Sequence, residues 1–210
     1  IIALKRLKIN SAPKGSGRTD RGVHATHQVM HIDLPLFWSY LQRLKEMLNL
    51  QLPNSLRILR IEFAECEFHA RYSAKRRIYR YVIKEGTTNP FEDNFVSFIP
   101  ALNREIITDA IKCFEGTHSF ELFKKSGNDM DHFTRIIYRA YAYSYKGYFV
   151  LVFEGNGFLR SQIRLMAGFL LRMSAGKATK EQLLEQLNCI KRHSTDIAPH
   201  NGLYLTRIKY

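Results

Sequence analysis

The stretch TRIIYRAYAYSYKGYFVLVFE, residues 134–154, predicts a β-hairpin. Two runs rich in aromatic and β-branched residues, 134–145 and 148–154, flank the pair Lys146 and Gly147. Two such runs joined by a short glycine-containing pair are typical of antiparallel strands connected by a tight turn. This hairpin, together with the elements around it, decides the fold class.

The sequence on both sides of the hairpin alternates between predicted strands and predicted helices. Extended runs rich in apolar residues predict strands over 27–34, 55–63, 77–84 and 203–210. Apolar periodicity predicts helices over 37–50, 104–115, 158–175 and 180–190, the second and fourth of these with Asn103 and Thr179 as N-caps. Residues 1–9 have the spacing of the last turns of another amphipathic helix. Strands and helices mixed in this order predict an α+β protein.

The composition predicts a globular protein with an anionic partner. The chain has 210 residues, of which 45% are hydrophobic, and its 32 Lys and Arg exceed its 19 Asp and Glu, giving a formal net charge of +13. A positive field attracts polyanions, and the 14 Phe and 11 Tyr residues supply candidate surfaces for unstacked bases. A ribosome-associated or membrane-surface protein would have a similar charge.

Cysteine usage and the lengths of the apolar runs indicate the compartment. The three cysteines are widely spaced and form no CxxC pair, which argues against a disulfide framework or a cysteine zinc site and favours a reducing compartment. No apolar run approaches the about 18 residues that a membrane helix needs. We therefore expect a soluble intracellular protein without a membrane partner.

The loop GRTDRGVHA, residues 17–25, places one carboxylate between two arginines. Guanidinium groups near a carboxylate favour its charged form, so Asp20 is a candidate nucleophile for a covalent intermediate. Gly17 and Gly22 can adopt positive φ angles, which suits a loop that wraps around a ligand. The alternative is a surface turn in which Asp20 caps a neighbouring amide and the arginines are solvated.

The exact string of this loop, Arg18-Thr19-Asp20 followed by Gly-Val-His-Ala, resembles the catalytic loop of the TruA family of tRNA pseudouridine synthases. Four further matches to the family's motifs follow in order along the chain. They are Phe68-His69-Ala70-Arg71 with Ala74 and Tyr79-Arg80-Tyr81, Gly116-Thr117-His118 with Phe120 and Phe123, Phe158-Leu159 with Arg164 and Gly168, and Ala198-Pro199 with Gly202-Leu203-Tyr204-Leu205. The resemblance therefore covers nearly the whole chain.

The resemblance implies a catalytic set of Asp20, Tyr79 and Arg164. Asp20 aligns with the nucleophile, Tyr79 with a tyrosine that stacks on the target uracil and can serve as general base, and Arg164 with an arginine that pairs with the aspartate. From the residues alone, Tyr79 and Tyr81 share a strand face and could both be core packing. Arg164 lies beside an apolar helix stripe and could extend its charged end to solvent.

The resemblance also implies a set of substrate- and RNA-binding residues. Arg18 is expected to help extrude the target base or hold a phosphate, and Arg71 to bind the RNA backbone. A basic cluster in the sequence could bind successive phosphates; it consists of Lys75, Arg76, Arg77 and Arg80. Two motif residues, His24 and Leu205, complete the predicted binding set. The alternatives are solvated surface arginines and a charged strand edge. His24, His27 and His31 have no acidic ligand set beside them, so we expect structural histidines, with no metal and no cofactor.

The architecture implied by the resemblance has two ferredoxin-like or RRM-like halves that share a central antiparallel sheet around a basic cleft. The halves would be residues 1–100 and 101–210, divided near Pro100. Family members normally begin with a strand that precedes a helix like residues 1–9, so we interpret that first strand as missing here. Gln162 resembles a eukaryotic subgroup often associated with mitochondria, which leaves the cytoplasm and the mitochondrial matrix open. A homodimer is possible because relatives include dimers and monomers.

Three functions follow from these observations. The first is an RNA pseudouridine synthase that isomerises specific uridines, with tRNA as partner and with other structured RNA as a possibility. The second is a noncatalytic RNA-binding or RNA-chaperone relative that uses the same cleft. The third is an unrelated basic assembly factor with an RRM-like surface, although the aromatic string of an RRM is not found in the sequence.

Overall fold

The computed structural model describes residues 1–125 and 132–210. The chain forms two compact units, each built from two segments. Unit 1 consists of Ile1–Gly17 and Val29–Ser73, and unit 2 consists of Arg18–Gln28 and Ala74–Tyr210. The chain therefore passes between the units three times, and the predicted catalytic loop belongs to unit 2 from Arg18 onward.

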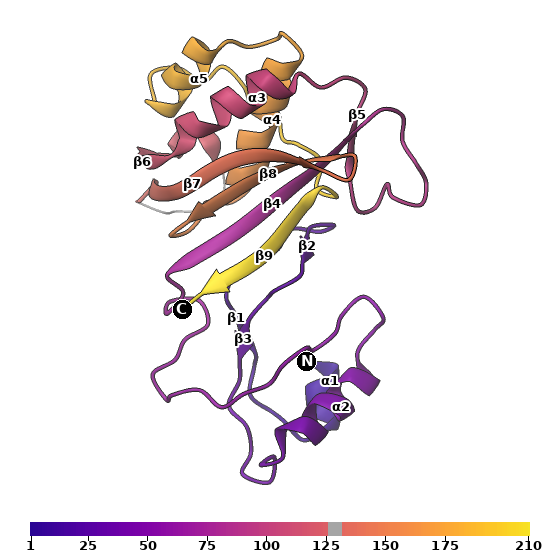
Figure 1. Cartoon of the computed structure of the whole chain (residues 1–210). Coiled ribbons are helices and arrows are strands. Elements are labelled where there is room, and N and C mark those ends of the chain that lie inside the picture. The colour runs from indigo at the N-terminus through magenta and orange to yellow at the C-terminus, as the bar shows by residue number, and fades with distance from the viewer. Residues whose placement is uncertain (126–131) are drawn as a thin grey trace. The chain divides into compact units, whose positions relative to one another are not determined.

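Unit 2 is built on a mostly antiparallel sheet of seven strands (Figure 1). The order across the sheet is β2-β9-β4-β8-β7-β6, and β5 pairs with β4. The strands in sequence order are β2 (His24–Ala25), β4 (Arg76–Glu85), β5 (Ser97–Ile99), β6 (Gly116–Ser119), β7 (Thr134–Tyr145), β8 (Tyr148–Gly155) and β9 (Leu203–Lys209). Only the pairs β2–β9 and β4–β5 are parallel. The predicted strands over 77–84 and 203–210 are confirmed within two residues.

The predicted hairpin is confirmed as β7 and β8. Tyr145 pairs with Tyr148, which leaves Lys146 and Gly147 as the two-residue turn. Both turn residues have positive φ angles, 48° for Lys146 and 83° for Gly147. A turn of this kind twists in the same sense as the strands, because two consecutive left-handed residues match the right-handed strand twist.

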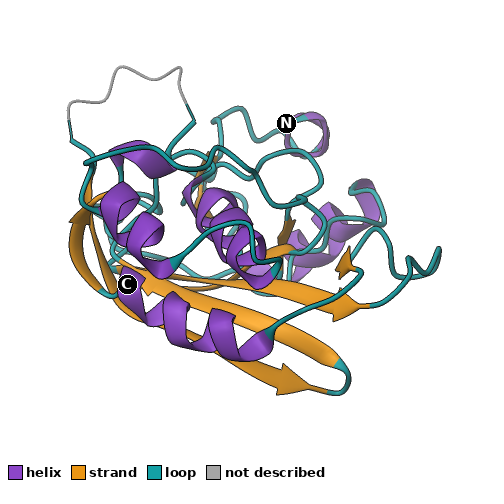
Figure 2. Cartoon of the chain, turned by 90° about the horizontal axis from the view of Figure 1, so that it is seen from above, coloured by secondary structure: helices purple, strands orange, loops and turns teal. Residues whose placement is uncertain are grey.

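Three α-helices cover one face of the sheet, as Figures 1 and 2 show. They are α3 (Arg104–Ala110), α4 (Gln162–Ser174) and α5 (Lys180–Leu187). The two predicted N-caps are confirmed: the side chain of Asn103 accepts a hydrogen bond from Ile106 N, and Thr179 forms a capping box with Gln182. The third predicted helix, α4, begins at Gln162 rather than 158, because the chain makes a tight turn before it.

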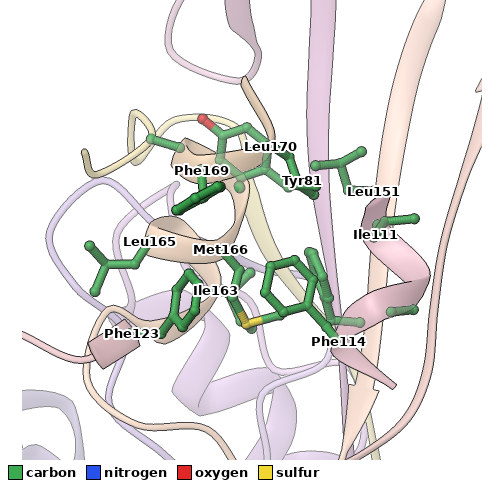
Figure 3. Close-up of a cluster of buried hydrophobic side chains, with 14 of the residues drawn as sticks. Tyr81, Ile111, Phe114, Phe123, Leu151, Ile163, Leu165, Met166, Phe169 and Leu170 are labelled. Carbon is green, nitrogen blue, oxygen red and sulfur yellow. The ribbon is translucent and has the colours of Figure 1, made fainter. Parts of the chain in front are cut away.

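The core of unit 2 lies between this helical layer and the sheet. Apolar side chains of α4 meet those of β4, β8 and the 3-10 helix that follows α3 (Figure 3); fully buried examples are Met166, Phe169, Tyr81, Leu151 and Phe114. The Tyr81 hydroxyl donates a hydrogen bond to Pro199 O at 2.9 Å, and burial raises the pKa of this phenol. Tyr81 is therefore part of the core, as the residues alone allowed.

Unit 1 has a smaller core around two helices. These are α1 (Ile2–Arg6) and α2 (Leu41–Gln51), and a two-stranded ladder joins β1 (Lys14–Gly15) to β3 (Met30–His31). Apolar side chains of both helices and of the loop after α1 form this core; they are Ala3, Leu4, Leu7, Ile9, Leu44 and Leu48. Helix α2 starts four residues later than predicted and ends at Gln51, just before Pro53.

Of two further strand predictions, one is wrong and the other is confirmed only in part. Residues 55–63 form no strand, because the side chain of Asn49 on α2 bonds both the N–H and the C=O of Ile58 and so replaces a neighbouring strand. Within 27–34 only Met30 and His31 pair in a ladder, since the chain leaves unit 2 at Gln28 and the following Ile32 and Leu34 pack against the unit 1 core.

The α+β class with a mostly antiparallel sheet is confirmed. The contacts divide the chain into units at other points than Pro100, so the two similar halves, 1–100 and 101–210, stay a prediction about internal symmetry. Among the residues that the structure describes, no helix is long and apolar enough to cross a bilayer.

Candidate active site

The loop that carries Asp20 is fixed to the sheet at its C-terminal end. His24 and Ala25 pair in parallel with Tyr204 and Leu205, and Thr26 N donates to Leu205 O at 2.9 Å. The backbone turns at Asp20, whose carbonyl accepts a hydrogen bond from Val23 N at 3.1 Å. The loop is therefore a tight turn anchored on β9.

Gly22 allows this turn in two ways. Its φ angle is 78°, which side chains rarely adopt, and a Cβ atom at this position would lie 2.9 Å from the His200 ring. The glycine thus lets His200 pack directly against the loop backbone. His200 was not singled out from the sequence, because no local pattern links it to residues 178 positions earlier.

His24 holds the other side of the loop. Its ring stacks between Phe95 and Tyr204, with ring centroids 5.3 and 4.7 Å away, and its Nε2 lies 2.8 Å from Asn94 O. These contacts favour the structural interpretation of His24 over RNA binding. Leu205 pairs with Ala25 through its backbone and its residue is only 1% exposed, so the predicted contact of its side chain with RNA stays a prediction.

Asp20 lies next to the N-terminal end of α4. One of its carboxylate oxygens, Oδ2, is 3.5 Å from Nη1 of Arg164 and 3.4 Å from Oγ of Ser161. The Asp20 side chain is 44% exposed, whereas that of Arg164 is 17% exposed. A substrate can therefore reach the carboxylate, while its cationic partner is held inside the protein.

Arg164 is fixed by a second interaction on its own side chain. Its Nε donates to Ala198 O at 2.8 Å, and Ala198 N donates back to the Arg164 carbonyl at 3.0 Å. This close approach requires Gly168, because a Cβ atom there would lie 2.1 Å from Asp196 O. Two of the sequence motifs, one on α4 and one at 198–199, thus meet to orient the guanidinium group toward Asp20. The ion pair that the resemblance implies is present, and its catalytic role stays a prediction.

Tyr79 lies on β4, on the same sheet face as Tyr81. Its ring packs edge to face against Phe158, with centroids 5.3 Å apart and planes at 82°. Burial raises the pKa of the Tyr79 phenol, Arg77 opposes this shift, and the Asp20 carboxylate adds to it. The phenol is therefore uncharged at neutral pH, which suits stacking better than proton removal.

A turn before α4 brings Ser161 to Asp20. Gln162 N donates to Leu159 O at 3.1 Å, and Gln162 Oε1 accepts from Leu159 N at 2.7 Å, so the turn is closed from both sides. The Gln162 side chain is fully buried. Sequence reasoning missed the contact of Ser161, because the helix predicted over 158–175 placed this serine inside the helix, whereas α4 begins after it.

The basic cluster on β4 is divided between the two faces of the sheet. Arg77 lies on the Tyr79 side, and its Nη1 donates to Asn156 O at 3.0 Å. Arg76 and Arg80 alternate with it and lie on the open face. There, Arg76 and Lys209 both pair with Glu154, at 3.2 and 2.9 Å.

The open face carries a shallow groove of about 520 Å³. Most of its polar lining is basic or aromatic: Arg80, Arg139, Arg207, Lys209, Tyr141 and Tyr204. The groove lies across the sheet from Tyr79, so the structure does not bring Arg80 to the Asp20 site.

The remaining predicted binding residues are exposed at other positions. Arg18 and Lys75 are exposed in unit 2, whereas Arg71 belongs to unit 1, where its guanidinium lies 5.6 Å from the centre of the Tyr72 ring. His31 also belongs to unit 1, and its Nδ1 accepts a hydrogen bond from Ala70 N. Within residues 1–125 and 132–210, no group of three or more His, Cys, Asp or Glu side chains could hold a metal ion.

Comparison with known proteins supplies the family. A sequence model described as tRNA pseudouridine synthase matches residues 110–210. The chain is 39% identical over 207 residues to tRNA pseudouridine synthase A of Wolinella succinogenes, covering 99% of this chain and 82% of that protein. It is 35% and 34% identical to proteins of the same name from Campylobacter jejuni strain RM1221 and Helicobacter hepaticus, covering 99% and 98% of this chain and 87% and 84% of theirs.

These relatives are bacterial, and they give no support to the mitochondrial subgroup suggested by Gln162. The buried position of Gln162 explains the residue by packing, since its side chain bonds the backbone of the turn before α4. Identity of this extent over nearly the whole chain shows that the protein belongs to the TruA family of tRNA pseudouridine synthases.

Proposed function

We propose that this protein converts specific uridines of tRNA into pseudouridine, with Asp20 as nucleophile. The observation that carries the proposal is the contact between Asp20 Oδ2 and Arg164 Nη1, two residues 144 positions apart. A half-exposed carboxylate held by a largely buried guanidinium is an oriented and accessible nucleophile. The family and the names of its bacterial relatives support tRNA as the substrate.

The reaction is an isomerisation that needs no oxidant and no second substrate. The target nucleotide is flipped out of the folded RNA, at a cost of a few kcal/mol for unstacking and unpairing. Asp20 attacks either C6 of the uracil or C1′ of the ribose, and the N1–C1′ bond breaks. The base turns, C5 bonds to C1′, the C5 proton leaves and N1 gains a proton, while the bond to Asp20 is released.

Arg164 and Tyr79 support this chemistry in different ways. Arg164 orients Asp20 through the contact at Oδ2, and its second bond, to Ala198 O, prevents the guanidinium from turning away. Tyr79 provides an uncharged aromatic ring beside the carboxylate on which uracil can stack. Stacking on Tyr79 would also keep the uracil in the site while it has no bond to C1′ of the ribose.

The exposed basic residues would bind the RNA backbone. Arg18 is exposed in the Asp20 loop and can fill the space that the flipped base leaves, or hold its phosphate. Lys75 and Arg71 provide further backbone contacts from their exposed positions. We propose the groove beside Arg80 as an additional phosphate-binding surface on the open face. Such a protein would act inside the cell, where tRNA is found.

The test is pseudouridine formation in unmodified tRNA transcripts, mapped by carbodiimide-dependent primer-extension stops. The unmodified protein should give site-specific stops, and Asp20→Ala should give none. Asp109→Ala is the matched control, because Asp109 is an exposed aspartate on α3 that forms an ion pair with Lys180 at 2.7 Å, away from Asp20. If the unmodified protein binds tRNA and produces no stop, the enzymatic proposal fails and the noncatalytic RNA-binding alternative gains its first support.

A further inference from the structure

Ser161 stands at the N-cap position of α4 and does not cap the helix. A serine at this position normally accepts a hydrogen bond from a backbone N–H of the first turn. In α4 the Ser161 side chain makes no such bond, whereas Asn103 and Thr179 do cap α3 and α5. The hydroxyl of Ser161 therefore does not make the N-capping hydrogen bond that its position predicts.

The backbone explains why the cap is absent. Asn103 and Thr179 are extended, with φ and ψ of −87° and 96° and of −107° and 168°, as capping residues normally are. Ser161 is left-handed, with φ 59° and ψ 8°. This conformation is uncommon for residues other than Gly, Asn and Asp, and such departures concentrate at functional sites.

The surrounding turn holds Ser161 in this conformation. Leu159 and Gln162 bond each other twice, once through the backbone and once through the buried Gln162 side chain. The left-handed residue between them directs its Oγ toward Asp20 Oδ2, 3.4 Å away. This is at the long end of hydrogen-bond distances, as contacts in substrate-free active sites commonly are before they tighten.

We propose that Ser161 is a positioning residue that, with Arg164, holds Oδ2 of Asp20 and leaves Oδ1 as the attacking oxygen. Both contacts fall on the same oxygen, at 3.4 and 3.5 Å. Two donors on one oxygen oppose rotation of the carboxylate about its Cβ–Cγ bond, so the second oxygen keeps a fixed direction. The inference rests on the proposed role of Asp20 as nucleophile.

The proposal separates activity from stability at one position. Ser161→Gly removes the hydroxyl, accommodates the left-handed backbone better than serine does, and breaks no capping bond. We expect kcat to fall about tenfold, as for loss of one hydrogen bond to a charged group, with KM for tRNA unchanged. The midpoint of thermal unfolding should stay the same or rise. Ser161→Asn tolerates the same backbone and offers an amide donor, so it should recover part of the lost kcat.

The matched control is Thr179→Gly on α5, where the side chain does cap its helix. This variant should lower the unfolding midpoint and leave kcat unchanged, the reverse of Ser161→Gly. Rates are measured as release of tritium from C5 of labelled target uridines, since the C5 proton leaves when C5 bonds to C1′.

Two results would overturn the inference while the proposed function stands. One is a kcat for Ser161→Gly equal to that of the unmodified protein while Asp20→Asn is inactive. The other is a loss of kcat in Ser161→Gly that follows a loss of stability and is not recovered by Ser161→Asn. If Asp20→Asn itself remains active, the proposed nucleophile is wrong and the role of Ser161 falls with it.

Discussion

The two faces of β4 differ more than their sequence suggests. On one face Tyr79 and Tyr81 lie under the helical layer, next to Asp20 and Arg164. On the other, Ile78, Arg80 and Val82 line an open groove with basic and aromatic neighbours. Neighbouring residues of β4 therefore lie in different surroundings, because successive side chains of a strand point to opposite faces of the sheet. The covered face is expected to carry the chemistry, and the open face to contribute binding only.

The sharpest test of this division is Arg164→Lys on the covered face. Lysine keeps the positive charge but cannot bond Ala198 O and Asp20 Oδ2 through two separate nitrogens, as the guanidinium does. We expect kcat to fall about 100-fold or more, with tRNA affinity within about twofold. Single-turnover kinetics and filter binding measure the two quantities separately.

Arg172→Lys is the control on the same helix. Arg172 pairs with Asp196 at 3.1 Å, its side chain is about twice as exposed as that of Arg164, and it makes no contact with Asp20. This substitution should leave kcat unchanged. An equal loss in both variants would mean that arginines of α4 act through stability and would remove the special role of Arg164.

Substitutions of Tyr79 distinguish stacking from proton removal. Because burial raises the pKa of the phenol above its ordinary value of 10, Tyr79 carries no charge between pH 7 and 9. Tyr79→Phe should therefore retain kcat within about tenfold, with an unchanged pH profile in this range. Tyr79→Ala, which removes the stacking surface, should lose about 10- to 100-fold. If kcat instead rises with pH in the unmodified protein and stays flat in Tyr79→Phe, the phenolate of Tyr79 acts as a base.

Substitutions on the open face should change affinity rather than rate. Exchanging Arg80 and Arg207 for Gln removes two of the groove's cations. If both bind phosphates, tRNA binding should weaken several-fold, and the slope of log affinity against log salt should fall by about one for each phosphate that is no longer neutralised. The rate at saturating tRNA should be unchanged. If the slope of log tRNA affinity against log salt does not change, the groove does not bind RNA. If the sedimentation coefficient of the substituted protein changes, the groove takes part in self-association.

The sequence predicted the parts of unit 2 that depend on local pattern. The β7–β8 hairpin, β4, β9 and the caps of α3 and α5 follow from alternation, a glycine turn and capping residues that lie next to the elements they define. The strand expected over 55–63 failed because a single side chain, Asn49, satisfies the backbone of Ile58. Apolar periodicity alone does not reveal such a distant hydrogen-bond partner.

The candidate site was less accessible to local reasoning. Asp20 and Arg164 are 144 positions apart, so only the resemblance to a family brought them together. The contact of Ser161 depends on a left-handed backbone that periodicity does not encode, and the helix predicted over 158–175 placed the residue inside the helix instead. Gly168 matched a motif, but its reason, the close approach of Asp196 O to α4, requires the folded chain.

The smallest expected effect concerns Glu154, the acid of the open face. Burial alone would raise the pKa of this carboxyl, but hydrogen bonds from Lys209 and Arg76 outweigh burial and lower it. A lowered pKa in the folded state means that the stabilisation is present above the ordinary value of 4.5 and is lost as pH falls below it. Glu154→Gln should therefore lower stability by about 1 kcal/mol at pH 7, since both cationic partners are partly exposed. The difference between the two proteins should shrink as the pH falls below 4.5 in urea unfolding. If the difference in unfolding free energy stays constant with pH, the effect of Glu154→Gln comes from packing rather than charge. The rate of pseudouridine formation should be the same in the two proteins.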